Sequence, residues 1–260
     1  MGRTADVIAV KGLRKEYGTP RGTVLALDEI DFTVGEGEFV AIVGPSGCGK
    51  STLLKILAGL LPATRGEVQL RSVPITGPRR DIGMVFQSPV LFPWRTVLDN
   101  VLLPVDVQRL GREDNRPRAL DLLALVGLHG FEHRYPWELS GGMQQRVAIT
   151  RGLIHNPAML LMDEPFGALD AMTRESLNLE LQRIWLERRE TVVFITHSIA
   201  EAVFLADRVL IMTPRPGRIT EQVPVGIPRP RPLDVMAAPE FGGIVRRIRA
   251  HFQSKGGLEA

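Results

Sequence analysis

Residues 44–52, GPSGCGKST, decide the fold expected for this chain. They follow the short apolar run 39–43, FVAIV, and they precede a segment with helical spacing from Lys50 to Ala58, which Gly59 is expected to end. The pattern G-x-x-x-x-G-K-[ST] between a strand and a helix is typical of a loop that wraps phosphate groups. Its glycines let backbone N–H groups turn inward, and the helix start adds partial positive charge. The segment therefore predicts an α/β fold that binds a nucleoside triphosphate at this loop.

Two side chains of this phosphate loop (residues 44–52) have predicted roles in nucleotide binding. Lys50 should reach the β and γ oxygens, and Ser51 should bind Mg²⁺. By its type alone Cys48 is a candidate nucleophile, but no histidine is near it in sequence, so we interpret it as a plain loop residue. A chance match in a glycine-containing loop is the alternative to the whole motif. The predicted nucleotide contacts here are Gly44, Pro45, Ser46, Gly47, Cys48, Gly49, Lys50, Ser51 and Thr52.

Two carboxylates follow a second apolar run, Leu160-Leu161-Met162. In open α/β sheets ligands bind at the carboxyl ends of the strands, where Asp163 and Glu164 would lie. Asp163 is expected to hold Mg²⁺ through water, and Glu164 to orient or deprotonate the attacking water. The alternative is a solvated strand end or a helix cap.

His197 also follows an apolar run, at residues 191–196. From that position it is a candidate for a hydrogen bond to the γ-phosphate or to the attacking water. A histidine after a strand is more often a surface or capping residue, so the pattern alone leaves both interpretations open.

The signature segment (residues 139–146, LSGGMQQR) supplies a second helix start. Ser140, Gly141 and Gly142 offer a hydroxyl and unblocked N–H groups to an anion. A capped helix with glycines for close packing would have the same sequence. Because the chain has one phosphate loop, a second anion site is explained by two chains related by a twofold axis, each completing the other's site.

The composition is that of an ordinary globular protein. The 260 residues are 44% hydrophobic and 23% charged, with a net charge of +3, which does not by itself indicate nucleic acid or an anionic membrane. The single cysteine excludes an intramolecular disulfide and a cysteine metal cluster. No apolar run approaches a membrane span, and residues 1–6 lack a secretory signal, so we expect a soluble chain whose membrane role requires a partner.

The order of elements predicts how the chain is organised. Residues 6–17 and 23–34 alternate as paired antiparallel edge strands, and strands and helices alternate from 158 to 213, which implies a parallel sheet. We expect an α/β fold of the P-loop NTPase type, with a mostly parallel sheet core, an antiparallel edge subdomain and an inserted helical subdomain. The Pro/Arg-rich residues 214–235 look extended rather than compact.

The domain boundaries that follow are an ATPase domain at 6–235, containing the helical subdomain at about 91–155, and a C-terminal tail at 236–260. The tail is expected to form a short amphipathic helix. Its apolar face would carry Phe241, Ile244, Val245 and Ile248.

These motifs, in this order, resemble those of ABC ATPases over roughly residues 7–225. The resemblance implies that Tyr17 stacks on adenine, that Gln87 senses magnesium and the membrane partner, and that His197 is the switch histidine. Residues 167–170, GALD, resemble the loop that crosses the dimer interface. Met143 stands where many members have glutamine, whereas Ser140 and Gly142, the expected contacts to the partner's γ-phosphate, are unchanged.

Residues 89–101, PVLFPWRTVLDNV, look like those of the nitrate/sulfonate/taurine branch of importers. The resemblance implies an ATP-binding subunit that works as a homodimer with integral membrane permease subunits, and indirectly with an extracytoplasmic solute-binding protein. It would sit peripherally on the cytoplasmic face of the inner (plasma) membrane. Phe92 and Trp94 belong either to the surface that receives a permease helix or to the subdomain core.

Two other functions compete with import. A soluble ABC ATPase acting on nucleic acid or the ribosome would need tandem ATPase domains or a long coiled-coil insertion, which this sequence does not contain. Arginines at 229, 231, 246, 247 and 249 are candidates for contacts with nucleic acid, but a solvated tail or a membrane-proximal surface is the preferred interpretation, and we expect no nucleic-acid partner. The ATPase subunit of an exporter is the remaining alternative.

Overall fold

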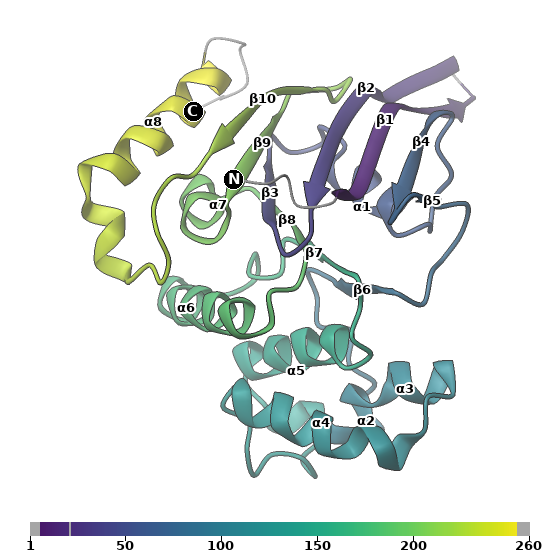
Figure 1. The fold of residues 1–260 in the computed structure, drawn as a ribbon, viewed down its shortest axis with the longest axis vertical. Coiled ribbons are helices and arrows are strands. Elements are labelled where there is room, and N and C mark those ends of the chain that lie inside the picture. The colour runs from purple at the N-terminus through teal and green to yellow at the C-terminus, as the bar shows by residue number, and fades with distance from the viewer. Residues whose placement is uncertain (1–5, 21, 254–260) are drawn as a thin grey trace. The chain divides into compact units, whose positions relative to one another are not determined.

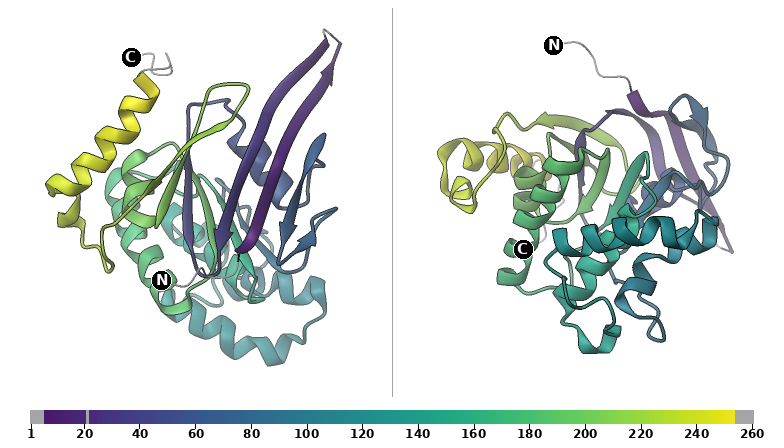
Figure 2. Two further views of the ribbon diagram at one scale, coloured as in Figure 1. Left: turned by 45° about the horizontal axis from the view of Figure 1, so that its top comes forward. Right: turned by 60° about the horizontal axis from the view of Figure 1, so that its bottom comes forward.

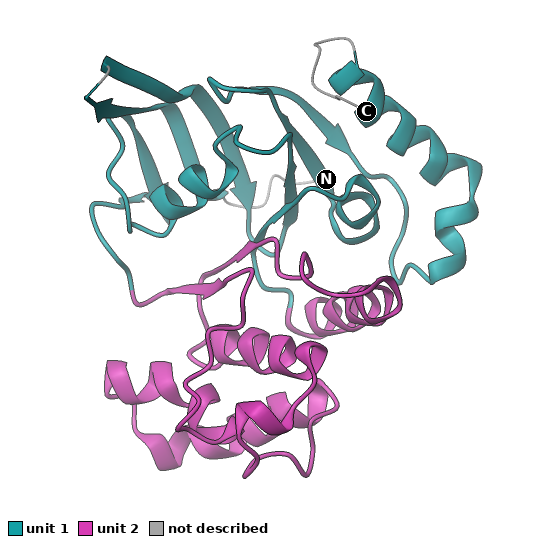
Figure 3. Cartoon of the chain, turned by 180° about the vertical axis from the view of Figure 1, so that it is seen from behind, with its two compact units in different colours: residues 1–79, 189–260 teal, residues 80–188 magenta. Residues whose placement is uncertain are grey.

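The computed structural model describes residues 6–20 and 22–253, and the chain divides into two compact units (Figure 3). Unit 1 comprises residues 1–79 and 189–260, and unit 2 comprises residues 80–188. Most of the chain start considered for a signal, and residues 254–260 of the expected tail, lie outside the described residues.

A mostly parallel sheet forms the centre of unit 1 (Figure 1). Its spatial order is β10-β9-β3-β8, in which β3 is parallel to both of its neighbours and β10 is antiparallel to β9. Strands β3 and β8 are buried along their whole length, as parallel strands covered on both faces usually are. The bounds are β3 (Phe39–Val43), β8 (Val192–Thr196), β9 (Arg208–Met212) and β10 (Ile219–Pro224).

An antiparallel sheet, in the order β2-β1-β4-β5, lies beside it in the same unit. Figure 2 shows its two long strands running side by side, which confirms the predicted pair of edge strands. The two shorter strands were not predicted. The bounds are β1 (Asp6–Thr19), β2 (Gly22–Gly35), β4 (Arg65–Leu70) and β5 (Val73–Pro74).

The helices of unit 1 are α1 (Lys50–Leu57), α7 (Ile199–Leu205) and α8 (Pro239–Gln253), with the short 3₁₀ helix η2 (Leu233–Ala237) before the last. Helix α7 packs on β3, β8 and β9, and α8 packs on α7. Helix α8 is amphipathic and buries Phe241, Ile248 and Phe252, whereas Ile244 and Val245 are half-buried.

Residues 214–235 are extended in part, as predicted, but the interpretation of their arginines as members of a solvated tail is wrong. Residues 219–224 form β10, and Arg231 is only 1% exposed. The guanidinium of Arg231 tolerates burial because each of its nitrogens is hydrogen-bonded. It donates hydrogen bonds of 2.7 to 3.0 Å to the backbone carbonyls of Val203, Phe204, Ala206 and Ile227. Several of these carbonyls end α7 and would otherwise lack partners.

Unit 2 contains the parallel pair β6 (Ile82–Val85) and β7 (Met159–Asp163) together with a group of helices. Helix α5 lies at the centre, in contact with α2, α3, α4, α6 and β6. It packs closely because Gly152 has no side chain: a Cβ there would lie 3.0 Å from Leu160 Cδ1 and 3.2 Å from Val85 Cγ2. The bounds are α2 (Val97–Val101), α3 (Leu103–Gln108), α4 (Arg112–Leu125), η1 (Pro136–Glu138), α5 (Gly141–Leu153) and α6 (Ala171–Arg188).

The predicted fold class is confirmed: parallel strands alternate with helices, an antiparallel sheet lies at the edge, and helices α2 to α5 follow one another between β6 and β7. The domain boundaries at 6–235, 91–155 and 236–260 stay predictions. In the part of the chain that the structure describes, no helix has the length and apolar character needed to cross a bilayer.

Candidate nucleotide site

The phosphate loop leaves the carboxyl end of β3 and runs into α1 in unit 1. Its backbone is left-handed at Gly47, with φ 73°, and at Gly49, with φ 105°, which is the N-cap of α1. A Cβ at Gly49 would lie 2.7 Å from Leu27 Cδ2, so a side chain would disturb both the backbone and the packing. The glycines therefore permit the tight curve that aims backbone N–H groups and the helix start at one point.

Lys50 folds back over this loop. Its Nζ donates to the carbonyls of Gly44 at 2.9 Å and of Pro45 at 3.1 Å, and the side chain is 6% exposed. Cys48 is fully buried, with its Sγ 4.0 Å from Lys50 Nζ. The ammonium group of Lys50 is thus held at the loop, where it can bind the oxygen of a phosphate.

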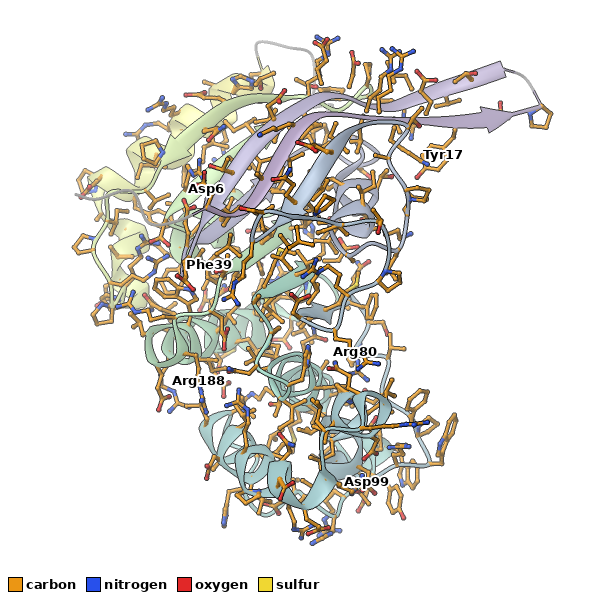
Figure 4. All side chains as sticks on the ribbon, turned by 45° about the vertical axis from the view of Figure 1, so that its right-hand side comes forward. Asp6, Tyr17, Phe39, Arg80, Asp99 and Arg188 are labelled. Atoms are coloured by element: carbon orange, nitrogen blue, oxygen red, sulfur yellow. The ribbon has the colours of Figure 1, made fainter. Side chains whose placement is uncertain are left out.

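Tyr17 lies near the turn of the β1–β2 hairpin, where Figure 4 labels it, and pairs in register with Val24. Its hydroxyl is 3.3 Å from Oγ1 of Thr52, which belongs to the first turn of α1. Tyr17 as a residue is 37% exposed. The structure therefore brings this aromatic side chain, distant in sequence, to the phosphate loop.

His197 leaves the sheet at the same edge as the phosphate loop. Val43 and Thr196 are register partners in the parallel pair β3–β8, so the residues that follow them start side by side. His197 is exposed, and the next residue, Ser198, caps α7 through its side chain, which accepts from Glu201 N. The histidine is thus held between the end of a buried strand and the start of a helix.

In unit 2, Gln87, Asp163 and Glu164 lie at or just after the carboxyl ends of two neighbouring parallel strands, β6 and β7. Val85 of β6 and Met162 of β7 are register partners, so residue 87 and Asp163 follow adjacent strand ends. Glu164 is half-buried and has a φ of 45°, which is unusual for a residue with a side chain and occurs often at functional positions. A Cβ added at Gly167 would lie 3.3 Å from Gln87 Nε2 and 3.3 Å from the Glu164 carbonyl, so these three residues are neighbours.

The signature segment starts α5, also in unit 2. Ser140 is the N-cap, and its Oγ accepts a 3.3 Å hydrogen bond from Met143 N. Ser140 and Gly141 are exposed, whereas Gly142 is buried, and a Cβ at Gly142 would lie 2.8 Å from Thr173 Cγ2. Both the capping and the packing interpretations of these residues fit, and an exposed helix start remains available to an anion.

The loop at residues 167–170 is fixed by its own cap. Asp170 accepts from Thr173 N at 3.0 Å and from Thr173 Oγ1 at 2.7 Å. These hydrogen bonds hold the pKa of the Asp170 carboxyl below its usual value. The carboxylate therefore stays charged at the start of α6, where the helix dipole favours it.

Two glutamines that sequence reasoning passed over tie the signature segment to other parts of unit 2. Gln144 Nε2 donates to Pro136 O at 2.9 Å and to Leu139 O at 3.3 Å. Gln145, which is 2% exposed, donates to the Phe86 carbonyl at 3.3 Å, one residue before Gln87. Two adjacent glutamines directly after the signature glycines were the signal available in the sequence.

The predicted site residues therefore form two groups, each gathered within its own unit. Tyr17, the phosphate loop and His197 belong to unit 1, whereas Gln87, the signature segment, Asp163 and Glu164 belong to unit 2. Their roles toward nucleotide stay predictions.

The chemistry of these groups suits ATP and Mg²⁺. The loop offers an ammonium and a helix start to phosphates, and Ser51, Gln87 and Asp163 offer the oxygen ligands that Mg²⁺ prefers. No cluster of three or more His, Cys, Asp or Glu side chains suited to a metal occurs in residues 6–20 and 22–253.

The chain is similar in sequence to ATP-binding proteins of ABC transporters. Residues 27–167 match the model of the family described as ABC transporter. An uncharacterized ABC transporter ATP-binding protein of Methanocaldococcus jannaschii is 49% identical, covering 86% of this chain and 84% of that protein. The taurine import ATP-binding protein TauB of Rhizobium johnstonii is 46% identical, covering 89% and 90%.

Two solved structures have the same fold. A bacterial ABC transporter cassette in a dimeric structure has a TM-score of 0.74 at 37% identity, covering 84% of this chain and 98% of that one. A dimeric post-hydrolysis state of an ATP-binding cassette bound to ADP and Pi has a TM-score of 0.73 at 36% identity, with the same coverage.

Proposed function

This chain belongs to the ABC transporter family, as an ATP-hydrolysing subunit of its taurine, nitrate and sulfonate branch, and we propose that two copies close around ATP to drive solute import. The solute is taurine, nitrate, a sulfonate or a similar small molecule. One observation is the main support for a dimer: the sequence has a single phosphate loop and, separately, an exposed helix start at Ser140 and Gly141. In a head-to-tail pair, the signature segment of one copy completes the nucleotide site of the other.

Within this site the side chains have distinct tasks. Lys50 binds the β and γ phosphates, Glu164 orients or deprotonates the attacking water, and His197 hydrogen-bonds the γ-phosphate or that water. Ser51, Gln87 and Asp163 would hold Mg²⁺, which would supply charge neutralisation at the phosphates. The dimeric cassettes among the solved relatives, one of them with ADP and Pi, support this arrangement.

The permease partner would bind a groove in unit 2. A cavity of about 370 Å³ is lined largely by apolar side chains, among them Met84, Phe92, Leu103 and Val107. Arg151 holds one rim in place by donating 2.7 Å hydrogen bonds to the backbone carbonyls of Pro89 and Val90. An apolar groove with a rigid rim suits an amphipathic helix.

The aromatic pair beside this groove favours the surface interpretation of Trp94. Trp94 is 70% exposed and stacks on the half-buried Phe92, with ring centroids 5.1 Å apart. The loop that carries them is fixed by the fully buried Asn100, which donates to Phe92 O at 3.1 Å and accepts from Phe92 N at 2.8 Å. Rigid, exposed aromatic side chains are common anchors of protein interfaces.

In the cell, the proposed subunit sits peripherally on the cytoplasmic face of the inner membrane, bound to permease subunits that receive solute from an extracytoplasmic binding protein. The nucleic-acid alternative loses one of its two arginine clusters, because Arg231 is buried and Arg229 is paired with Asp207. Neither arginine is available to phosphates of a nucleic acid.

Protein concentration tests the proposed site. If each site needs two copies, the specific ATPase activity of the isolated chain rises with protein concentration. First-order activity down to nanomolar protein contradicts the proposal, and Lys50→Ala is the inactive control.

A further inference from the structure

We propose that Lys15 is a positioning residue that fixes the Tyr17 ring as a platform for the adenine base of ATP. The proposal rests on the proposed function and extends its nucleotide site. All of the residues that carry it belong to unit 1.

Lys15 is buried, which is unusual for a lysine. It lies on β1 and is 9% exposed, and its Nζ donates a 2.8 Å hydrogen bond to the carbonyl of Pro62. Lysines are seldom buried unless their charge is compensated. Here the ammonium faces a carbonyl dipole and an aromatic ring, which suggests that the position serves that ring.

The ring is that of Tyr17, two residues along the same strand. Lys15 Nζ lies over it, 5.2 Å from its centroid, within the range in which a cation is attracted to an aromatic face. At its other end the Tyr17 hydroxyl is 3.3 Å from Thr52 Oγ1. The ring is therefore held both at its face and at its tip.

These contacts set the ring relative to the phosphates. Thr52 lies in the first turn of α1, directly after the glycines of the phosphate loop, and Pro62 lies in the segment after α1. Lys15 and Tyr17 thus join β1 to the segment after α1 and to the first turn of that helix. A base stacked on the ring would be placed at a fixed distance from the triphosphate bound to the loop.

The position of the cation also determines which ring face is available. The ammonium lies over one face, and Tyr17 as a residue remains 37% exposed, so we expect the base to stack on the opposite face. A ring already fixed loses less side-chain freedom when the base binds. Removing the cation should therefore weaken ATP binding by about three- to tenfold and leave triphosphate binding unchanged.

The test compares two ligands by titration calorimetry: Mg-ATP and Mg-tripolyphosphate, which has no base. Lys15→Met should weaken the first by about three- to tenfold and leave the second within about twofold of wild type. Lys15→Arg, which keeps the cation, should bind ATP nearly as wild type does. Lys11→Met is the matched control, because Lys11 is an exposed lysine on the same strand.

A double-mutant cycle then assigns the effect to the ring. In a Tyr17→Ala background, Lys15→Met should cause no further loss of ATP affinity. Equal losses for both ligands, no loss for ATP, or additive losses in the cycle would overturn the proposal. Should Lys15→Met fail to fold, Lys15→Gln, whose amide can still donate to Pro62, allows the same comparison.

The titrations distinguish a failure of the proposed function from a failure of the role proposed for Lys15. If the wild-type chain binds neither ligand, the proposed function is wrong. If it binds both and the lysine variants match it, only the role of Lys15 is wrong.

Discussion

The hydroxyl of Thr196 donates a 2.6 Å hydrogen bond to Oε2 of Glu201, and the same hydroxyl accepts a 2.9 Å bond from Ser198 N. Both Thr196 and Glu201 are buried, whereas His197 between them is exposed. This pair therefore fixes the turn that presents the histidine. It is a local device, built from the end of β8 and the first turn of α7.

Glu201→Ala should accordingly reduce turnover more than nucleotide binding. Loss of the carboxylate frees the turn, and misplacement of a group by about 1 Å can lower a rate by up to about 100-fold. We expect kcat to fall by about 10- to 100-fold with the Kd for ATP within about twofold of wild type. Steady-state kinetics and calorimetry check this, with the exposed Glu240→Ala as control. An unchanged kcat would remove Glu201 from this role.

Glu164→Gln should keep ATP binding while hydrolysis falls by roughly 10²-fold or more. The amide preserves the size of the side chain, so the backbone at φ 45° and the contact with the neighbouring Gly167 backbone should persist. Nucleotide affinity and single-turnover hydrolysis are the measurements. Normal turnover by this variant would mean that another group acts on the water.

Arg231→Met should destabilise the protein. The substitution leaves the carbonyls at the end of α7 without their donor, and we expect a loss of about 2–4 kcal/mol in the free energy of unfolding. Burial lowers the pKa of Arg231 to about 10, so the guanidinium is charged at neutral pH and suits a helix C-terminus. Chemical denaturation measures the loss.

The control for this experiment is Arg247→Met. Arg247 is a largely exposed arginine of α8 that pairs with Glu221, and its replacement should cost less than about 1 kcal/mol. Equal effects of the two substitutions would contradict the capping role of Arg231.

The stability of the protein should depend on His155 as pH falls. Burial lowers the pKa of His155 below 6.5, so the folded state takes up its proton less readily than the unfolded state. The stabilising contribution is present above pH 6.5 and is lost as pH falls through 6.5 toward the lower folded pKa.

The free energy of unfolding should therefore fall between pH 7.5 and 5.5 by less in His155→Gln than in wild type. After allowance for solvent screening, the difference is a few tenths to about 1 kcal/mol. The exposed His129→Gln should follow wild type, and parallel curves for all three proteins would contradict the prediction.

Much of the fold was predictable because its decisive segments are local. The strands that end at Val43, Asp163 and Thr196 are short, mainly apolar runs that end at a glycine-rich loop or at polar residues, and strands of this kind are recognisable from their composition. The phosphate loop was recognisable because its glycines meet a steric requirement that few other residues satisfy.

What was missed depends on tertiary contacts. Arg231 looks like a solvated tail residue in sequence, and it is buried only because α7 ends beside it with unpaired carbonyls. The contacts of Gln145 with Phe86 and of Lys15 with Tyr17 join residues whose proximity depends on the fold. No propensity or period identifies such pairs.

The most direct test of the central claim is the mass of the Glu164→Gln chain in solution with Mg-ATP, measured by light scattering after gel filtration. The account predicts a species of about twice 28.7 kDa with Mg-ATP, and single copies with ADP or when Ser140→Arg is added. Single copies with Mg-ATP, or pairs that persist when Ser140→Arg blocks the helix start, would contradict it.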